Sequence, residues 1–396
     1  MTDSQRWLLP EGIEEALPAS AERLESRRRQ LLDLYHTWGY ELVIPPLVEY
    51  LESLLTGTGH GLALQTFKLT DQLNGRLMGL RADMTPQVAR IAAHQLAHRD
   101  ILRLCYIGSV VHTRPVDFAG SRSPMQVGCE LYGHAGLDGD FEVLNLMLET
   151  LRICQVEAPL LDLGHVAIYR QLVAAAGLEP NEESELFALM QNKAMPDLRA
   201  ALAAWDIDAA AREHLLVLPE LNGDLSVLDE ARQRLKTAGS SVQLALDDLE
   251  AIARRLQLRH PNLMLHFDLA ELRGYHYHTG LVFAAFLPGA GQEVARGGRY
   301  DEIGREFGRA RPATGFSTDL RTLVRLSTAP AEESSGGIFA PADHDPALQA
   351  MVEVLRLEGR RVIQGFQGQV QDPQAAGCAQ MLVKQNNQWT VVDVSA

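Results

Sequence analysis

A long helical block separates two groups of strand-like segments, and this arrangement narrows the folds open to the chain. Residues 180–258 are acidic, rich in Ala and Leu, and follow a helical pattern almost throughout, with no catalytic-looking cluster. Strand-like runs lie before this block and return after it, in residues 262–270, 279–289 and 292–300. We therefore interpret residues 180–258 as an inserted helical subdomain.

The N-terminal part combines one helix with an interrupted strand. Residues 13–39 have an amphipathic pattern, and Gly39 ends the predicted helix. Its apolar stripe consists of Leu24, Leu31, Tyr35 and Trp38. The apolar run 40–50 contains Pro45 and Pro46, which cannot donate ladder hydrogen bonds, so we expect this strand at a sheet edge or an interface.

A hairpin and a well-marked helix start follow. Two strand-like runs within residues 65–82 flank Asn74-Gly75, a strong signal for a tight β-hairpin. The next helix has Pro86 at its first position, and Thr85 is the predicted cap.

The remaining segments before the linker alternate between strands and helices. Residues 102–113 and 124–133 are β-rich, and the polar loop 114–123 between them predicts an antiparallel pair. Residues 141–176 have a helix, strand, helix pattern, and residues 318–326 read as a last helix.

The composition of residues 327–337 marks a linker. We therefore predict a main domain over residues 1–326 and a small module over residues 338–396. The pattern of that module is strand, helix, strand, strand.

The charge and cysteine content argue against several classes of protein. A net charge of -15 lowers the expectation of a polynucleotide partner, because such proteins usually carry a basic face. The 4 cysteines form no CxxC pair, which argues against a zinc ribbon and favours a reducing cytoplasm. We see neither a signal-like start nor an apolar run long enough for a membrane span, so we expect a cytoplasmic protein without a membrane partner.

Three segments carry the chemistry. The first is Arg81 to Thr85, with the sequence RADMT, and the second runs from Ile107 to Glu130. The third pairs RGYHYHTG at 273–280 with RGGRYD at 296–301. Their order, content and spacing resemble class II histidyl-tRNA synthetases over roughly residues 5–326.

This resemblance implies an α+β fold. We expect a class II synthetase-like antiparallel sheet flanked by helices, the helical insertion, and the small C-terminal α/β module. The segment with Pro45 and Pro46 resembles the family's dimer motif, which implies a homodimer core.

The resemblance also implies a histidine pocket. An acid and a threonine after the hairpin hold the amino group, and a glutamine and a glutamate lie on the following strand. An arginine lies near the carboxylate, and tyrosines lie at the imidazole end. Such groups suit an ammonium, a carboxylate and an imidazole chemically. The matching residues are Asp83, Thr85, Gln126, Glu130, Arg273, Tyr277 and Tyr300. His276 and His278 replace an acid and a tyrosine of the family, and they are possible imidazole-side residues.

The family's ATP site is degenerate in this sequence. Adenylate chemistry needs cations at the phosphates. His112 aligns with a phosphate arginine, and Arg114 replaces an acid expected near adenine. Asp319 occupies a small glycine position, and the last arginine falls on Thr322.

Simpler roles are open for single residues. Asp83 could serve only as an acid at a helix N-terminus, and Gly297 and Gly298 could form a bulge. A buried Glu130 is harder to explain without a partner, because an unpaired buried carboxylate is costly. His94 and His98 lack a third ligand of zinc-site type, so we expect no metal and no cofactor.

A pocket without its ATP chemistry indicates binding as the function. Within the family, the paralogue that fits is the regulatory subunit of short-form ATP phosphoribosyltransferase, the first enzyme of histidine biosynthesis. The resemblance then implies a non-catalytic subunit that binds L-histidine, mediates feedback inhibition and is required for full activity of the short catalytic subunit. It also implies a hetero-oligomer that works without tRNA. The alternatives are an active histidyl-tRNA synthetase and another histidine-activating paralogue, and both need the missing arginines.

Overall fold

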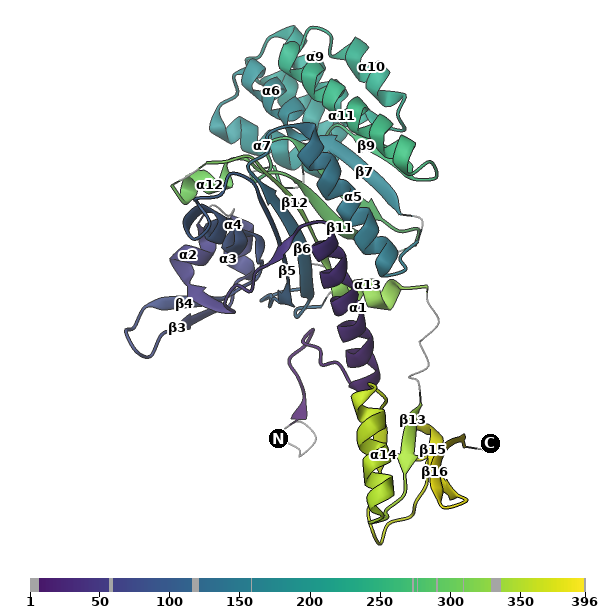
Figure 1. Cartoon of the computed structure of the whole chain (residues 1–396). Coiled ribbons are helices and arrows are strands. Elements are labelled where there is room, and N and C mark those ends of the chain that lie inside the picture. Colours follow the sequence, from purple (N-terminus) through teal and green to yellow (C-terminus); the bar gives the residue numbers. More distant parts are fainter. Residues whose placement is uncertain are drawn as a thin grey trace. The chain divides into compact units, whose positions relative to one another are not determined.

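The computed structural model describes residues 7–56, 60–115, 121–157, 159–272, 274–275, 277–289, 291–308, 310–328 and 336–394 (Figure 1). The chain divides into two compact units, Met1–Thr328 and Ala329–Ala396. No helix in the described part of the chain has both the length and the apolar character that a membrane crossing requires.

The first unit is a mixed α+β structure. Its helices are α1 (Pro18–Thr37), α2 (Leu51–Leu55), α3 (His60–Gln65), α4 (Thr85–His94), α5 (Leu137–Ile153), α6 (Val166–Ala176), α7 (Pro180–Gln191), α8 (Met195–Ala204), α9 (Ala209–Val217), α10 (Val227–Arg234), α11 (Ser240–Arg259), α12 (Ile303–Glu306) and α13 (Leu320–Leu326). Its strands are β1 (Glu41–Leu42), β2 (Val48–Tyr50), β3 (Lys68–Thr70), β4 (Leu77–Leu80), β5 (Leu102–Ser109), β6 (Met125–Tyr132), β7 (Leu160–His165), β8 (Asn222–Gly223), β9 (Met264–Asp268), β10 (Leu281–Phe286), β11 (Glu293–Arg299) and β12 (Ala313–Asp319).

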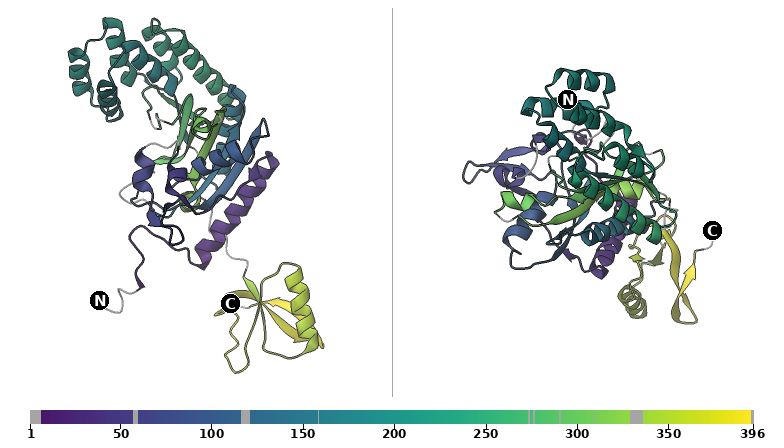
Figure 2. Two further views of the ribbon diagram at one scale, coloured as in Figure 1. Left: turned by 90° about the vertical axis from the view of Figure 1, so that its left-hand side faces the viewer. Right: turned by 90° about the horizontal axis from the view of Figure 1, so that it is seen from above.

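A nine-stranded sheet forms the centre of this unit, in the order β1-β5-β6-β12-β11-β10-β7-β9-β8. The six strands from β5 to β7 in this order pair antiparallel, whereas β1 with β5 and β7 with β9 pair parallel. In Figure 1, α4 lies on one side of β5 and β6, and α1 and α5 lie on the other. Figures 1 and 2 show the teal helices of residues 180–258 gathered at one end of the sheet.

Strand β6 contributes side chains to both faces of the sheet, because successive side chains of a strand point to opposite sides. Val127, Cys129 and Leu131 enter the large core that includes α1 and α5. Tyr132 enters a second core with residues of α4 and α12. Glu130 shares the face of Tyr132, so a polar residue of β6 points toward the α4 side.

The interrupted N-terminal strand lies at an edge, as predicted. β1 is the outermost strand beside β5, and the chain then leaves this sheet at the prolines. β2 instead joins the predicted hairpin in a separate three-stranded sheet, β2-β4-β3. Gly75 in the hairpin loop has φ +75°, a conformation that favours glycine.

Several local predictions need correction. α1 begins at Pro18 rather than at residue 13, because proline is favoured in the first helical turn. Thr85 does not cap α4. Met84 occupies the cap position, and the Asp83 carboxylate accepts the Thr85 N–H instead. Asp319 belongs to β12, a strand that the sequence did not predict, and α13 starts only at Leu320.

The second unit is a four-stranded sheet with one helix. Its elements are β13 (Gly337–Ala340), α14 (Pro346–Leu357), β14 (Val362–Gln364), β15 (Cys378–Gln385) and β16 (Gln388–Asp393). The strand order is β14-β13-β15-β16. The sheet therefore has one strand more than the predicted pattern of strand, helix, strand, strand. α14 buries Leu348, Val352 and Leu355 against the sheet, and the Asp345 carboxylate caps its first turn.

Candidate functional site

Glycines on the α4 face of the sheet make room for polar side chains of neighbouring strands. Gly315 on β12 pairs with Glu130 on β6, and a Cβ on Gly315 would lie 1.6 Å from Glu130 Oε2. Gly128 pairs with Tyr106 on β5, and a Cβ there would lie 2.3 Å from Tyr106 Oη. These two glycines therefore let a carboxylate and a phenol lie close to the sheet.

Glu130 is the centre of the site. Only 1% of its surface is exposed. Tyr106 donates a hydrogen bond to Oε1 over 2.9 Å, and Tyr300 donates one to Oε2. Burial raises the pKa of Glu130 to about 8, although the two tyrosine hydrogen bonds act in the opposite direction. The carboxyl group is therefore buried and held by hydroxyl groups.

Two further tyrosines surround Tyr300. The Tyr277 ring stacks on the Tyr300 ring, with the centroids 4.9 Å apart. The hydroxyl oxygens of Tyr300 and Tyr132 lie 3.4 Å apart. The Tyr277 hydroxyl is buried and has no hydrogen-bond partner among the described residues. The structure thus brings Tyr277 and Tyr300 together beside Glu130.

Asp83, Thr85 and Gln126 form a second polar group at the start of α4. Gln126 donates to Asp83 Oδ1 over 2.7 Å, and its own carbonyl accepts the Met84 N–H. The Thr85 N–H also donates to Asp83 Oδ1. The other carboxylate oxygen of Asp83 has no protein partner among the described residues. This oxygen is available to a ligand.

Tyr106 joins the two groups. Its hydroxyl lies 2.9 Å from Thr85 Oγ1 as well as 2.9 Å from Glu130 Oε1. Neither Tyr106 nor Tyr132 was predicted from the sequence as a site residue. The available signal was their position on predicted strands, with Tyr106 opposite a glycine and Tyr132 two residues after Glu130.

A buried ion pair fixes the end of β11 behind the tyrosines. Arg299 Nη2 lies 2.8 Å from Asp140 Oδ2, and both side chains are less than a tenth exposed. Arg299 also contacts Asp301 Oδ1 over 3.2 Å and donates to two backbone carbonyls near the start of α5. This anchoring sets the position of Tyr300, which follows directly in the chain.

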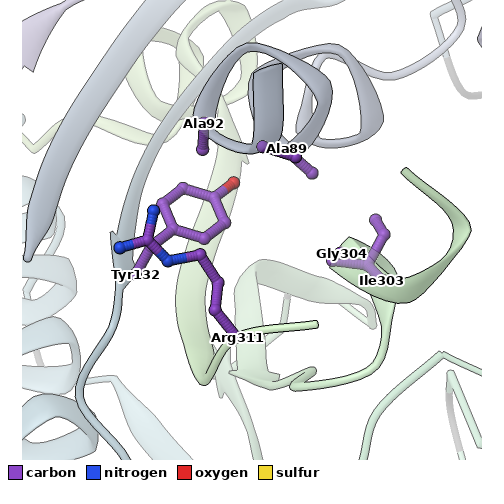
Figure 3. A pocket seen from close by; sticks show the side chains of 7 residues that line it. Ala89, Ala92, Tyr132, Ile303, Gly304 and Arg311 are labelled. Atoms are coloured by element: carbon purple, nitrogen blue, oxygen red, sulfur yellow. The ribbon is translucent and has the colours of Figure 1, made fainter. Parts of the chain in front are cut away.

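A small pocket lies beyond Tyr132, under α4 (Figure 3). Figure 3 shows the Tyr132 ring and the Arg311 side chain facing this space, with Ile303 and Gly304 opposite. Helix α4 contributes Ala89, Ala92 and Ala93 to its lining. Arg311 donates to the backbone carbonyls of Arg99 and Asp100. This pocket is too narrow to hold a water molecule.

Two candidate residues, Arg273 and His276, lie outside the described residues. The partly buried His278 Nδ1 lies 3.3 Å from the Arg299 carbonyl oxygen, and its ring lies under Gly298. Burial lowers the pKa of His278 to about 4, so its ring is neutral at physiological pH. His278 contacts Tyr277 edge-on at 5.3 Å, which places it behind that tyrosine.

Asp319 caps helix α13 from the end of β12. Its carboxylate accepts the N–H groups of Arg321 and Thr322 and the Thr322 hydroxyl. It also accepts the Met125 N–H over 2.9 Å. Asp319 therefore supplies a negative charge at the helix N-terminus, where a phosphate would otherwise be favoured.

The other two altered positions lie in the loop after β5. His112 Nε2 lies 2.9 Å from the Ala82 carbonyl oxygen, which fixes this nitrogen as the donor. Arg122 Nε donates to the His112 carbonyl and Arg122 Nη1 to the Glu11 carbonyl. Arg114 is exposed. Within the described residues, no group of three or more His, Cys, Asp or Glu side chains could hold a metal ion.

Comparison with known proteins first defines a class. The histidyl-tRNA synthetase family matches residues 12–323. The structure is similar to that of a histidyl-tRNA synthetase from Nostoc sp. PCC 7120, with a TM-score of 0.76 at 19% identity, covering 98% of this chain and 97% of that one. The first unit thus has the class II synthetase fold, which confirms the predicted fold class.

Similar sequences then identify a more specific family within the proteins that have this fold. Residues 335–392 match the family described as "ATP phosphoribosyltransferase subunit HisZ C-terminal domain". An ATP phosphoribosyltransferase regulatory subunit from Thioalkalivibrio sulfidiphilus is 66% identical over 396 residues, covering 100% of both chains. One from Pseudomonas putida is 54% identical, also with 100% of both chains covered. The chain belongs to the family of ATP phosphoribosyltransferase regulatory subunits.

A solved structure links both names. The ATP phosphoribosyltransferase regulatory subunit/histidyl-tRNA synthetase from Bacillus halodurans has a TM-score of 0.82 at 25% identity, covering 95% of this chain and 97% of that one. The membership confirms the predicted family and a regulatory, non-catalytic role in histidine biosynthesis.

Proposed function

We propose that this chain is a histidine sensor: it binds free L-histidine at the Glu130 site and transmits feedback inhibition to a short-form ATP phosphoribosyltransferase. The observation that carries the proposal is a buried Glu130 held by Tyr106 and Tyr300, next to an acidic group at the start of α4. The relatives' names supply the partner enzyme.

The two polar groups match the two ends of histidine. An ammonium needs acceptors, and Asp83 and Thr85 offer a carboxylate oxygen and a hydroxyl oxygen. An imidazole carries one donor and one acceptor, which Glu130 and a tyrosine hydroxyl such as that of Tyr277 can satisfy. Arg273 is proposed as the partner of the carboxylate, and His276 and His278 as supports at the imidazole end.

We further propose that the chain does not activate histidine with ATP. Asp319 supports this proposal, because its carboxylate adds negative charge where the family's ATP site has a small residue. His112 stands where the family has an arginine, and its Nε2 is bound to the Ala82 carbonyl. A carboxylate opposes negative charge that develops on a phosphate, and the Nε2 donor of His112 is already used by the Ala82 carbonyl.

Regulation requires that histidine distinguish two states of the assembly. A ligand shifts an equilibrium only through its different affinities for the two states. Linkage then makes the effect reciprocal, with couplings of typically 1–3 kcal/mol. We propose a homodimer of this chain within a hetero-oligomer of the cytoplasm, without tRNA or a cofactor.

Binding and assembly can be tested separately. Calorimetry with L-histidine should give heat with the purified chain, and Glu130→Ala should weaken binding by at least roughly 2 kcal/mol, because a buried ligand donor loses its acceptor. In a second experiment, the chain and the transferase should co-elute, and the mixture should form phosphoribosyl-ATP faster than the transferase alone. If L-histidine gives no heat with the chain, the proposed binding is refuted. If the chain and the transferase elute separately, the proposed assembly is refuted.

A further inference from the structure

Three oxygen-bearing side chains form a line between the two ends of the site. Thr85 Oγ1 lies 2.9 Å from Tyr106 Oη, which lies 2.9 Å from Glu130 Oε1. The three residues come from α4, β5 and β6. The line therefore connects the amino-end group with the carboxylate at the tyrosine end.

The chemistry of these groups fixes the direction of the hydrogen bonds. Tyr106 donates to Glu130 Oε1, while Tyr300 donates to Oε2, so the one hydroxyl proton of Tyr106 is committed to Glu130. The Tyr106 oxygen can then only accept from Thr85, whose one hydroxyl proton is thereby committed. Thr85 Oγ1 is left with a lone pair and no proton for a ligand.

Asp83, like the Thr85 hydroxyl, offers a ligand hydrogen-bond acceptors and no donor. Its Oδ1 already accepts from the Thr85 N–H and from Gln126. Its Oδ2, without a partner among the described residues, can only accept while the carboxylate is ionised. A ligand group that meets Asp83 and Thr85 together must therefore bring donors. An ammonium brings three, and a hydroxyl brings one.

The sheet holds Tyr106 where its hydroxyl can accept from Thr85 and donate to Glu130. The Tyr106 side chain is fully buried, with 0% exposed. Its hydroxyl occupies the space over Gly128, where a Cβ would lie 2.3 Å away. The phenol therefore has little freedom to turn away from Thr85 and Glu130.

We propose that Tyr106 is a positioning residue which, by orienting the Thr85 hydroxyl, makes the site select α-amino acids over α-hydroxy acids. This inference rests on the proposed histidine-binding function and adds the specificity of the amino end. Tyr106 acts through Thr85 and is not assigned a direct contact with the ligand.

The test compares ligands that differ in one group. L-histidine and histidinol both carry the amine, whereas imidazolelactate carries a hydroxyl in its place. Calorimetry on the full chain gives the ratio of dissociation constants for imidazolelactate and L-histidine. In Tyr106→Phe, the affinities for L-histidine and histidinol should both fall roughly 10-fold, as expected for a lost hydrogen bond to a charged ligand group. Imidazolelactate should change less than about 3-fold, because the freed Thr85 proton can serve its hydroxyl.

Tyr35→Phe is the matched control. Tyr35 is also fully buried, and its hydroxyl lies 3.1 Å from Thr150 Oγ1 in the core on the other face of the sheet. This variant should leave the ratio of the two dissociation constants unchanged. It therefore shows whether the loss of any buried hydroxyl alters the preference for an amine over a hydroxyl.

Thr85 supplies a second test should Tyr106→Phe fail to fold. Thr85→Val should lower the ratio in the same way, and Thr85→Ser, which keeps the hydroxyl, should preserve it. Equal losses for all three ligands, or an unchanged ratio, would overturn the inference while leaving histidine binding intact. If the unaltered chain binds no L-histidine, the proposed function fails, and this inference fails with it.

Discussion

At the scale of single residues, Glu130 carries the most unusual environment in the described chain's binding site. The carboxyl is buried, two tyrosines donate to it, and burial raises its pKa to about 8. In the unfolded chain the same group titrates near its ordinary value of 4.5. Between these two values the folded state binds more protons than the unfolded state.

This difference predicts the pH dependence of stability. The free energy of unfolding of the ligand-free chain should fall as pH rises from about 4.5 through 8, with a slope of at most about 1.4 kcal/mol per pH unit from this group. Urea unfolding at several pH values measures it. Glu130→Gln is isosteric and does not titrate, so its unfolding free energy should depend less on pH over this range. Parallel profiles for the two proteins would show that Glu130 does not titrate in this window.

Asp319 provides a second prediction at this scale. Asp319→Ala removes the cap of α13, so the free energy of unfolding should fall by about 1 kcal/mol. Asp319→Asn keeps one capping oxygen and should lose less. Neither variant should gain histidine-dependent pyrophosphate exchange with ATP, because His112 still stands in place of the arginine that binds phosphate in the family. Exchange in Asp319→Ala would contradict this account of the ATP site.

At the scale of elements, β6 and β12 build the site by pairing a glutamate with a glycine. Gly315 lies opposite Glu130, and its missing side chain is the space that the carboxylate fills. This pairing joins residues 185 positions apart, so strand periodicity alone could not reveal it. β12 itself was not predicted, because its run from Ala313 to Asp319 lacks a clear alternation of apolar and polar residues.

A substitution at Gly315 tests this pairing. In Gly315→Ala, the new Cβ would lie 1.6 Å from Glu130 Oε2 and 2.8 Å from the Cys129 carbonyl oxygen. Either Glu130 or the backbone must move, so L-histidine binding measured by calorimetry should be lost. Gly61→Ala is the control, since its Cβ would meet nothing within 4 Å. Normal histidine binding by Gly315→Ala would show that the carboxylate position is not needed.

Much of the remaining element order could be predicted from local signals. Asn74-Gly75 marked the hairpin, the prolines marked the edge of β1, and the long polar loop marked the β5–β6 pair. The contacts among Asp83, Thr85, Gln126 and Glu130 depended on the family resemblance, because they join α4 to β6 across the fold. Tyr106 was missed, because nothing local distinguishes a buried strand tyrosine from a core residue.

At the scale of the whole molecule, the class II fold and the family membership define a subunit that regulates rather than catalyses. The central proposal is that histidine acts through the Glu130 site of this chain. A pyrophosphate-exchange assay should find no ATP-dependent activation of histidine, and His112→Arg alone should not restore it, since Asp319 and Thr322 remain. Exchange by the unaltered chain at ordinary synthetase rates would contradict the regulatory reading.

The most direct test measures phosphoribosyl-ATP formation by the complex of this chain with a short-form ATP phosphoribosyltransferase, with increasing L-histidine. Three complexes are compared: the unaltered chain, Glu130→Ala, and the Tyr35→Phe control. Histidine should inhibit the first and third alike. The Glu130→Ala complex should co-elute and stay active, but need at least roughly 30-fold more histidine for the same inhibition, as a loss of about 2 kcal/mol implies. Unchanged inhibition in an assembled Glu130→Ala complex would place the histidine sensor elsewhere and contradict the account.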